Sequence, residues 1–293
     1  MTIDRRSYDM PDGVMSALHF NAEKGPVRLV FAHANGFNGQ SYRQILEQLD
    51  VHVIAIDQRG HGMTTLPTEK ENLDSFHIFA NDLTTFIGRY VPGKVMLSGH
   101  SFGAVACILS APQLTDRLAA YTGFDPVSMP WFGRQMPKSK LIRAYMKKRV
   151  PMIRKAGQRR RVFESLEFAL DRYKNRGAFS AISETILKDY LEGGLLPEGD
   201  KVKLACDPLW EQAVFCAQGH NLYKAANFLP KLSEAHYAGQ FAVSSKATRA
   251  KLGRAIGEGN IHFNPEFSHM FPLQKPDYAV KVLDRLVKRV DWD

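Results

Sequence analysis

The sequence predicts an α/β fold: a mostly parallel, twisted sheet flanked by helices, with a mainly helical segment inserted into it. Short apolar runs alternate with amphipathic stretches between residues 14 and 124. Strands that alternate with helices of this length form parallel sheets. From residue 128 the apolar spacing becomes helical, and strand-like runs return near residues 235 and 260. A change of period within one chain indicates a sheet domain interrupted by an insertion.

The predicted elements follow from local patterns along the chain. Runs of apolar and β-branched residues that end in Gly-, Asn- or Asp-containing loops predict strands. These strands are expected at residues 14–20, 28–32, 51–56, 94–98, 119–124, 235–238 and 260–263. Helical spacing of apolar residues predicts helices at residues 42–49, 75–90, 102–110 and 276–290. The last of these begins with Pro276, a residue that suits a first helical turn.

The domain division follows the same change of pattern. Residues 1–127 are expected to form the first part of the sheet domain and residues 235–293 its second part. Residues 128–234 are expected to form the helical insertion. A chain of 293 residues can bury one large core that carries such an insertion.

Composition excludes several classes of protein. Hydrophobic residues make up 44% of the chain and charged residues 24%, which excludes a disordered or fibrous protein. The three cysteines are odd in number and fit no zinc-site spacing, a pattern that suits a reducing compartment. Cys107 lies in an apolar run, so we expect it to be a buried thiol. No apolar run resembles a signal peptide or a membrane-spanning helix. We therefore expect a cytoplasmic protein that uses neither a metal nor another cofactor.

Positive charge is concentrated in one segment. The chain has a net charge of +9, and residues 138–161 contain eleven Lys and Arg and no acidic residue. A solvated helix face is the default interpretation of such a run. Weak association with an anionic membrane or lipid is a second, because Leu141 and Tyr145 recur at helical spacing. Nucleic-acid binding is a third, but no recognised module accompanies the run, so we expect no nucleic-acid partner.

The strongest chemical signal is Gly-His-Ser-Phe-Gly at residues 99–103, between a predicted strand and a predicted helix. Such a turn holds the serine hydroxyl exposed above the sheet, and crowding requires small flanking residues, here Gly99 and Gly103. The first N–H groups of the helix are free, so the N–H of Phe102 can donate to an oxyanion. We expect Ser101 to be a nucleophile; a glycine-rich turn with a capping serine is the alternative.

Together with this turn, three further segments resemble the α/β-hydrolase superfamily and occur in its order. They are His-Ala-Asn-Gly-Phe at residues 33–37, Asp-Gln-Arg-Gly-His-Gly at 57–62 and Ser-His-Met-Phe-Pro-Leu at 268–273. The resemblance covers nearly the whole chain. It implies that the N–H of Asn35 is a second oxyanion donor and that His33 is structural. It also implies that His269, between the last strand and the last helix, is the base.

The acid of the expected triad departs from the majority pattern of the family. The usual position, after the seventh strand, is occupied by Ala242, and no aspartate occurs between Asp207 and Asp277. A minority arrangement, found in haloalkane dehalogenases, places the acid after the sixth strand, where this chain has Asp125. We therefore expect Asp125 to orient His269 and stabilise its imidazolium form.

Two glutamates are alternatives for this role. Glu258 also lies near the last predicted strand, whereas Glu266 is only three residues before His269, where local backbone geometry disfavours it.

The identity of the nucleophile, Ser101, indicates the type of reaction, because haloalkane dehalogenases and epoxide hydrolases carry an aspartate nucleophile. A serine nucleophile favours acyl transfer to water through an acyl-enzyme.

In the superfamily, an insertion after the sixth strand is a cap that covers the active site. Residues 128–234 occupy that place, and parts of them resemble caps of esterase- and lipase-like members. Met129, Trp131, Phe132 and Met136 are expected to line an acyl pocket, although packing in a helical core is an equally good explanation.

These expectations describe a carboxylic ester hydrolase that acts on a small-molecule acyl or aryl ester, lipids included. A related hydrolase of thioesters, amides or C–C bonds is an alternative. A non-catalytic receptor or scaffold on the same fold is another, motivated by the missing acid after the seventh strand.

Overall fold

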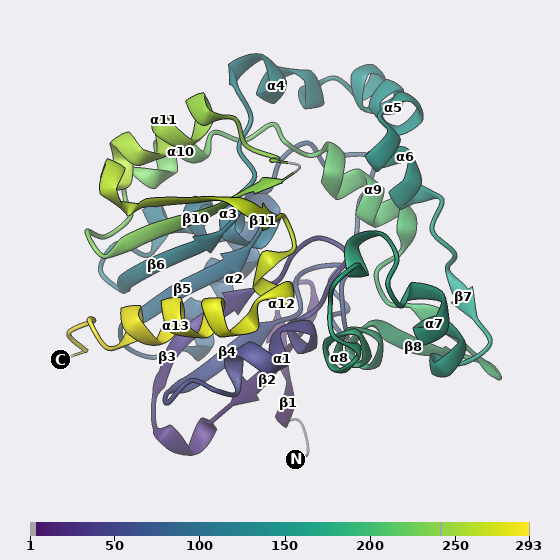
Figure 1. Ribbon diagram of the computed structural model, residues 1–293, viewed down its shortest axis with the longest axis horizontal. Coiled ribbons are helices and arrows are strands. Elements are labelled where there is room, and N and C mark those ends of the chain that lie inside the picture. Colours follow the sequence, from purple (N-terminus) through teal and green to yellow (C-terminus); the bar gives the residue numbers. More distant parts are fainter. Residues whose placement is uncertain (1–3, 241, 293) are drawn as a thin grey trace.

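The computed structural model describes residues 4–240 and 242–292 (Figure 1). Eight strands form one sheet of order β1-β2-β4-β3-β5-β6-β10-β11. The pairs β1–β2 and β2–β4 are antiparallel, and the other five pairs are parallel. The strands are β1 (Asp4–Met10), β2 (Gly13–Phe20), β3 (Val27–Ala32), β4 (His52–Ile56), β5 (Val95–His100), β6 (Leu118–Phe124), β10 (Ser233–Gln240) and β11 (Ile261–Ser268). The predicted α/β class is confirmed.

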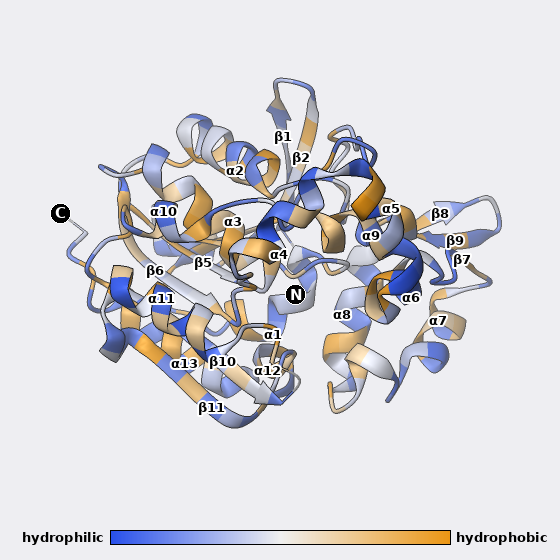
Figure 2. Cartoon of the chain, turned by 90° about the horizontal axis from the view of Figure 1, so that it is seen from above, coloured by the Kyte–Doolittle hydropathy of each residue, from blue (hydrophilic) through white to orange (hydrophobic). Residues whose placement is uncertain are grey.

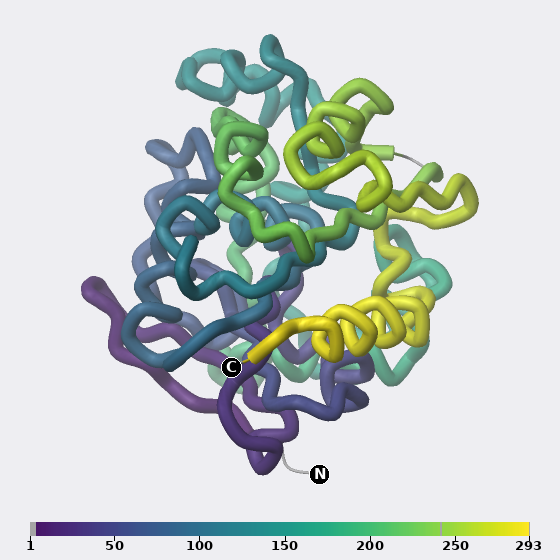
Figure 3. Tube along the Cα trace, turned by 90° about the vertical axis from the view of Figure 1, so that its left-hand side faces the viewer, coloured from purple at the N-terminus to yellow at the C-terminus, as the bar shows by residue number. Residues whose placement is uncertain are grey.

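Helices cover both faces of this sheet. On one face lie α2 (His77–Tyr90), α3 (Phe102–Ser110), α10 (Leu222–Ala226) and α11 (Lys246–Ile256). On the other lie α1 (Arg43–Leu46), α12 (Phe271–Gln274) and α13 (Pro276–Val287). Figure 3 shows α13, in yellow, on the opposite side of the sheet from the blue helices α2 and α3. Each face therefore buries its own hydrophobic cluster against the sheet.

Burial explains which strands the sequence predicts. All residues of β4 and β5 are buried, and strands buried on both faces have continuous apolar runs. The edge strand β1 was not predicted, because most of its side chains are exposed or half-buried and carry charge. Its register, from Asp4 opposite His19 to Met10 opposite Gly13, makes it a hairpin with β2.

The insertion lies between β6 and β10, and Figure 1 shows most of it beside the sheet in teal and green. Its helices before α10 are α4 (Trp131–Gln135), α5 (Lys140–Arg149), α6 (Pro151–Gly157), α7 (Leu166–Tyr173), α8 (Glu184–Gly194) and α9 (Pro208–Cys216). It also contains a small antiparallel sheet that the sequence did not predict: β7 (Val162–Phe163), β8 (Leu195–Glu198) and β9 (Lys201–Leu204). α10 packs on α3 and α11, so the end of the 128–234 segment lies with the sheet domain.

Short 3₁₀ helices complete the secondary structure at Ala22–Lys24, Gly39–Tyr42, Ala111–Gln113, Met136–Lys138, Gly177–Phe179 and Glu258–Asn260. Within residues 4–240 and 242–292, no helix has the length and apolarity needed to cross a membrane.

The carboxyl ends of the parallel strands meet at one edge of the sheet. β3, β5 and β6 end there at Ala32, His100 and Phe124, and β11 ends at Ser268. In open α/β sheets this edge is where ligands bind. The segments directly after these four strands carry Asn35, Ser101, Phe102, Asp125 and His269, the catalytic and oxyanion residues that the sequence predicts.

Candidate active site

Ser101 lies in a sharp turn between β5 and α3. Its φ of 58° and ψ of −119° lie outside the regions that L-residues prefer, and such strain persists only where the surroundings impose it. The Ser101 N–H donates to the carbonyl of Phe124 at 2.8 Å. A Cβ at Gly99 would lie 2.7 Å from the backbone nitrogen of Ala104, and one at Gly103 would collide with the backbone of Ala32 and His33. Packing thus requires both glycines of the motif.

The imidazole of His269 lies between Ser101 and Asp125. Its Nδ1 is 2.6 Å from Asp125 Oδ2, and its Nε2 is 2.9 Å from Ser101 Oγ. Because an ionised carboxylate only accepts, Nδ1 carries the proton and donates a hydrogen bond to Asp125. The neutral ring then leaves Nε2 as an acceptor for the serine hydroxyl. The structure brings these three side chains into one hydrogen-bonded array.

Asp125 follows β6 directly and is only 1% exposed. Its own N–H donates to the carbonyl of His236 at 2.7 Å, and Ala238 N–H donates to Asp125 Oδ1 at 3.4 Å. The backbone of the neighbouring strand β10 therefore holds this carboxylate in place. The alternatives Glu258 and Glu266 are both exposed, and the carboxylate hydrogen-bonded to His269 is that of Asp125.

A second buried histidine fixes the loop that carries His269. His100 Nε2 is 2.8 Å from the carbonyl of His269, and its Nδ1 is 2.7 Å from the hydroxyl of Tyr42. A carbonyl only accepts, so Nε2–H donates to it and Nδ1 accepts from Tyr42. Tyr42 in turn accepts from Ala34 N–H at 3.1 Å. The sequence did not predict Tyr42, which lies 58 residues before His100 and belongs to no motif.

The loop after β3 approaches Ser101 from the other side. Asn35 and Phe102, the two expected oxyanion donors, line the same cavity as Ser101 and His269. The Asn35 side chain donates to the backbone carbonyl of Glu211 in α9 at 3.0 Å. The insertion therefore fastens directly onto this loop.

Gly36, next in the same loop, has a φ of +76°, a conformation that favours glycine. A Cβ there would lie 2.7 Å from Glu211 Oε1, and the Gly36 N–H donates to His61 Nε2 at 3.0 Å. Both backbone shape and the neighbouring carboxylate thus require a glycine.

Two buried histidines support this region without facing the cavity. Burial lowers the pKa of His33 to about 4 and that of His61 to about 3, so both are neutral at pH 7. Neutral His33 accepts the N–H of Gln58 at its Nε2, at 2.9 Å. His33 is therefore a support between the loops after β3 and β4.

The cavity above Ser101 has a volume of about 500 Å³. Most of its lining residues are apolar: Ala34, Phe37, Phe76, Phe102, Val127, Met129, Met152, Ala178, Val214, Phe215, Val243 and Met270. The polar ones are Asn35, Ser101, Glu211, Gln218 and His269, and no Lys or Arg is among them. Such a cavity suits a neutral apolar group held beside the serine.

Of the four residues predicted to line an acyl pocket, the structure places only Met129 in the cavity. The prediction is wrong for Trp131, Phe132 and Met136, which are 58%, 76% and 44% exposed. The rings of Trp131 and Phe132 pack on each other 4.8 Å apart. Helical spacing identifies an apolar face, but it does not say whether that face turns inward.

Glu211 is a buried carboxylate that the sequence did not single out as functional. Burial raises its pKa, and the ion pair of its Oε2 with Arg159 Nη1, at 2.5 Å, opposes this effect. Arg159 also donates to the hydroxyls of Tyr173 at 3.0 Å and Tyr190 at 2.6 Å. One arginine of the basic run thus lies behind the wall of the cavity.

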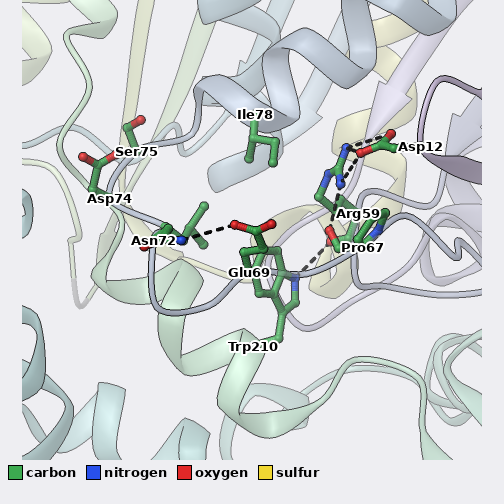
Figure 4. A pocket seen from close by; sticks show the side chains of 10 residues that line it. Asp12, Arg59, Pro67, Glu69, Asn72, Asp74, Ser75, Ile78 and Trp210 are labelled. Atoms are coloured by element: carbon green, nitrogen blue, oxygen red, sulfur yellow. Dashed lines mark hydrogen bonds and ion pairs between the residues drawn. The ribbon is translucent and has the colours of Figure 1, made fainter. Parts of the chain in front are cut away.

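A separate hollow of about 280 Å³, shown in Figure 4, lies beside Arg59 and Trp210. Arg59 is ion-paired with Asp12 at 3.1 Å and Asp82 at 2.8 Å, and its carbonyl accepts from Trp210 Nε1 at 3.0 Å. Ser101 does not line this hollow. The ion pairs of Arg59 join the loop after β4 to the β1–β2 turn and to α2, and the hydrogen bond from Trp210 attaches α9 to the same loop.

Glu234, His236 and His262 lie close enough to hold a metal ion. Both carboxylate oxygens of Glu234 accept from Arg285, at 2.7 and 2.6 Å. These bonds, together with the one from His236, hold the pKa of Glu234 well below its usual range despite burial. The guanidinium occupies the positions that a cation would take, so the group is an ion-pair network of the sheet edge.

Comparisons with known proteins agree with this fold. Residues 29–239 match the model of the alpha/beta hydrolase family, so the chain belongs to this family. A 2-(acetamidomethylene)succinate hydrolase from Mesorhizobium japonicum is 28% identical over 103 residues. That match spans 34% of this chain and 36% of the relative.

Solved structures show the same fold at low identity. The crystal structure of E-2-(acetamidomethylene)succinate hydrolase superposes with a TM-score of 0.76 at 19% identity, covering 98% of this chain and 100% of that one. The thioesterase domain from the curacin biosynthetic pathway gives 0.73 at 14%, covering 98% and 100%. A peroxisomal alpha/beta-hydrolase from Saccharomyces cerevisiae gives 0.74 at 14%, covering 97% and 87%.

Proposed function

We propose that the protein is a serine hydrolase that cleaves carboxylic esters of neutral apolar acyl or aryl groups through an acyl-enzyme on Ser101. The observation that carries this proposal is the hydrogen-bonded array of Ser101, His269 and Asp125. It opens into a cavity lined mainly by apolar side chains. A receptor would have no need of a strained serine aligned with a base and a carboxylate.

The three side chains of this array can carry out each proton transfer that hydrolysis through an acyl-enzyme requires. Ser101 Oγ attacks the ester carbonyl carbon while its proton moves to His269 Nε2. Asp125, already bonded to Nδ1, stabilises the imidazolium that forms. The oxyanion accepts from the N–H groups of Asn35 and Phe102, and one such donor contributes about 3 kcal/mol.

Collapse of the tetrahedral intermediate breaks the bond to the leaving alcohol, which takes the proton from His269. Water then attacks the acyl-enzyme, and His269 accepts a proton from it. A second collapse releases the carboxylic acid and returns the proton to Ser101. The cap side chains around the cavity limit access of bulk water during these steps.

The substrate proposed here differs from that in the name of the bacterial relative. That name specifies a succinate, and the two carboxylates of a succinate need cationic or N–H donors. The cavity beside Ser101 has no Lys or Arg in its lining, and its one acidic residue, Glu211, is already paired with Arg159. This charge pattern favours a neutral acyl group.

Labelling with a fluorophosphonate tests the proposal directly. We expect one adduct per chain, mapped to the peptide that contains Ser101 and absent in Ser101→Ala. Ser180→Ala changes an exposed serine and should be labelled like the wild type. We also expect hydrolysis of nitrophenyl butyrate that is lost in Ser101→Ala alone. Absence of both the adduct and the hydrolysis in the folded wild type would contradict the proposal.

A further inference from the structure

A second, larger hollow lies against the cavity that contains Ser101. Its volume is about 1050 Å³, and we call it the basic vestibule. Its lining is formed by Phe37, Pro151, Met152, Lys155, Ala156, Gln158, Arg159, Arg160, Arg172, Tyr173, Arg176, Gly177, Ala178, Phe179, Glu211 and Phe215. Five of these residues also line the cavity above Ser101: Phe37, Met152, Ala178, Glu211 and Phe215. The two hollows therefore adjoin along these shared residues.

Charge distinguishes the two hollows sharply. The vestibule is lined by five basic residues and one acidic residue, Glu211, whereas no Lys or Arg lines the cavity above Ser101. Figure 2 shows hydrophilic residues, in blue, and hydrophobic residues, in orange, side by side along α6 and its neighbours in the insertion. A molecule that fills both hollows therefore needs a neutral apolar end and an anionic end.

Two of the five cations are already neutralised. Arg159 is paired with Glu211 at 2.5 Å, and Arg160 with Glu164 at 2.7 Å. For Lys155, Arg172 and Arg176, the described part of the chain supplies no acidic side chain within 4 Å. These three cations come from different segments, α6 and the end of α7 with the loop after it. Their positive charge is available to a ligand.

The basic run that the sequence singled out is divided by the fold. Arg143 is 5% exposed and donates to the backbone carbonyls of Pro137 and Glu71, so it serves the packing of the insertion. Lys155, Arg159 and Arg160 turn to the vestibule. Association of the remaining exposed part with an anionic membrane stays a prediction.

We infer that the basic vestibule binds a phosphate group carried by the leaving group of the substrate. The inference rests on the proposed ester hydrolysis at Ser101. The neutral acyl chain occupies the cavity, the scissile carbonyl lies at Ser101, and the alcohol or thiol side extends past Phe37 and Glu211. Three unpaired cations match a phosphate, which carries close to two negative charges and accepts several hydrogen bonds. Arginine suits this role because its planar guanidinium binds phosphate oxygens in pairs.

Two matched pairs of substrates test the inference. One pair is 1-hexanoylglycerol 3-phosphate and 1-hexanoylglycerol, which differ only by the phosphate. The other is S-hexanoyl 4′-phosphopantetheine and S-hexanoyl pantetheine, which separates an ester-linked source of the phosphate from a thioester-linked one. In at least one pair, we expect kcat/KM to be about tenfold higher for the phosphorylated member, since charge-assisted contacts of this size are worth that factor.

The double variant Arg172→Gln/Arg176→Gln should remove most of that preference and leave kcat/KM of the neutral substrate unchanged. Lys174→Gln/Lys188→Gln is the matched control, because it removes two exposed positive charges near α7 and α8 outside the vestibule lining. The preference should also fall between low and moderate salt.

Equal kcat/KM within both pairs would overturn the inference, as would an equal loss for both members in the vestibule variant. These results are distinct from failure of the proposed function. Labelling of Ser101 and hydrolysis of 1-hexanoylglycerol would persist if the vestibule binds no phosphate, and both would be absent if Ser101 is not a nucleophile.

Discussion

The imidazole of His100 donates to the backbone carbonyl of His269 at 2.8 Å, so the residue before the candidate nucleophile holds the loop of the candidate base. Through Tyr42, the same ring is joined to Ala34, beside the expected oxyanion donor Asn35. One buried chain of hydrogen bonds therefore sets the positions of both loops relative to Ser101. Burial lowers the pKa of His100 well below its usual range, which keeps the ring neutral and this bond direction fixed.

Tyr42→Phe tests this chain of hydrogen bonds. The change removes the acceptor of Ala34 N–H and the donor to His100, and a buried polar group left unpaired costs about 1–3 kcal/mol of stability. We expect kcat for nitrophenyl butyrate to fall by about tenfold at unchanged KM, because the loops lose alignment and not their apolar contacts. Tyr145→Phe, at an exposed position, is the control. A Tyr42→Phe enzyme with wild-type kcat would show that the link does not position the site.

Asp125→Asn tests the carboxylate. An amide at this position can present a donor to Nδ1, which favours the wrong tautomer of His269, and the equivalent change in a serine triad lowers kcat by about 10⁴. Steady-state hydrolysis together with circular dichroism separates this loss from unfolding. Glu258→Gln alters an exposed carboxylate and should keep full activity. The assignment fails if activity survives in Asp125→Asn and disappears in Glu258→Gln.

The fold was predictable where burial of a strand produces a run of apolar residues in the sequence. β3 to β6 are buried apolar runs between turn-forming loops, so their existence and their positions along the chain follow from pattern alone. β1 lacks such a run because it is an exposed edge. The strands β7 to β9 are two to four residues long and partly charged, too short for a periodic signal.

The site was predictable where motifs are local. Ser101 and His269 belong to recognisable loops, and Asp125 follows from its position after a strand although it lies 144 residues from His269. Tyr42 and Glu211 belong to no recognisable motif, since their importance depends on which distant residues they contact after folding. The outward-facing Trp131 shows the same limit, because spacing does not reveal what covers a helix.

Gly36→Ala tests the loop after β3. The new Cβ meets the Glu211 carboxylate, and the alanine must adopt the φ of +76° that Gly36 has. We expect the loop to move in response, so that the N–H of Asn35 shifts away from the oxyanion position. Loss of one such donor lowers kcat by about 10²–10³ with little change in KM. Gly88→Ala is the control, because a Cβ there meets nothing within 4 Å and α2 gains a better helix former. Equal kcat values in both variants would contradict an oxyanion role for this loop.

The buried histidines make stability depend on pH. The folded-state pKa values of His33 and His61, about 4 and about 3, lie below the 6.5 of an unfolded histidine. The unfolded chain therefore binds more protons between these values, and stability falls as pH decreases from 6.5 towards 4. Each ring contributes a loss of about 2 kcal/mol between pH 7 and pH 5.

Urea unfolding at these two pH values should show the decrease in the free energy of unfolding with an unchanged m-value. His61→Gln keeps an acceptor for Gly36 N–H without a titrating ring, so its dependence should be shallower, whereas His77→Gln, at an exposed position, should behave like the wild type. If the free energy of unfolding is the same at pH 5 and pH 7, these two rings are not buried in their neutral form.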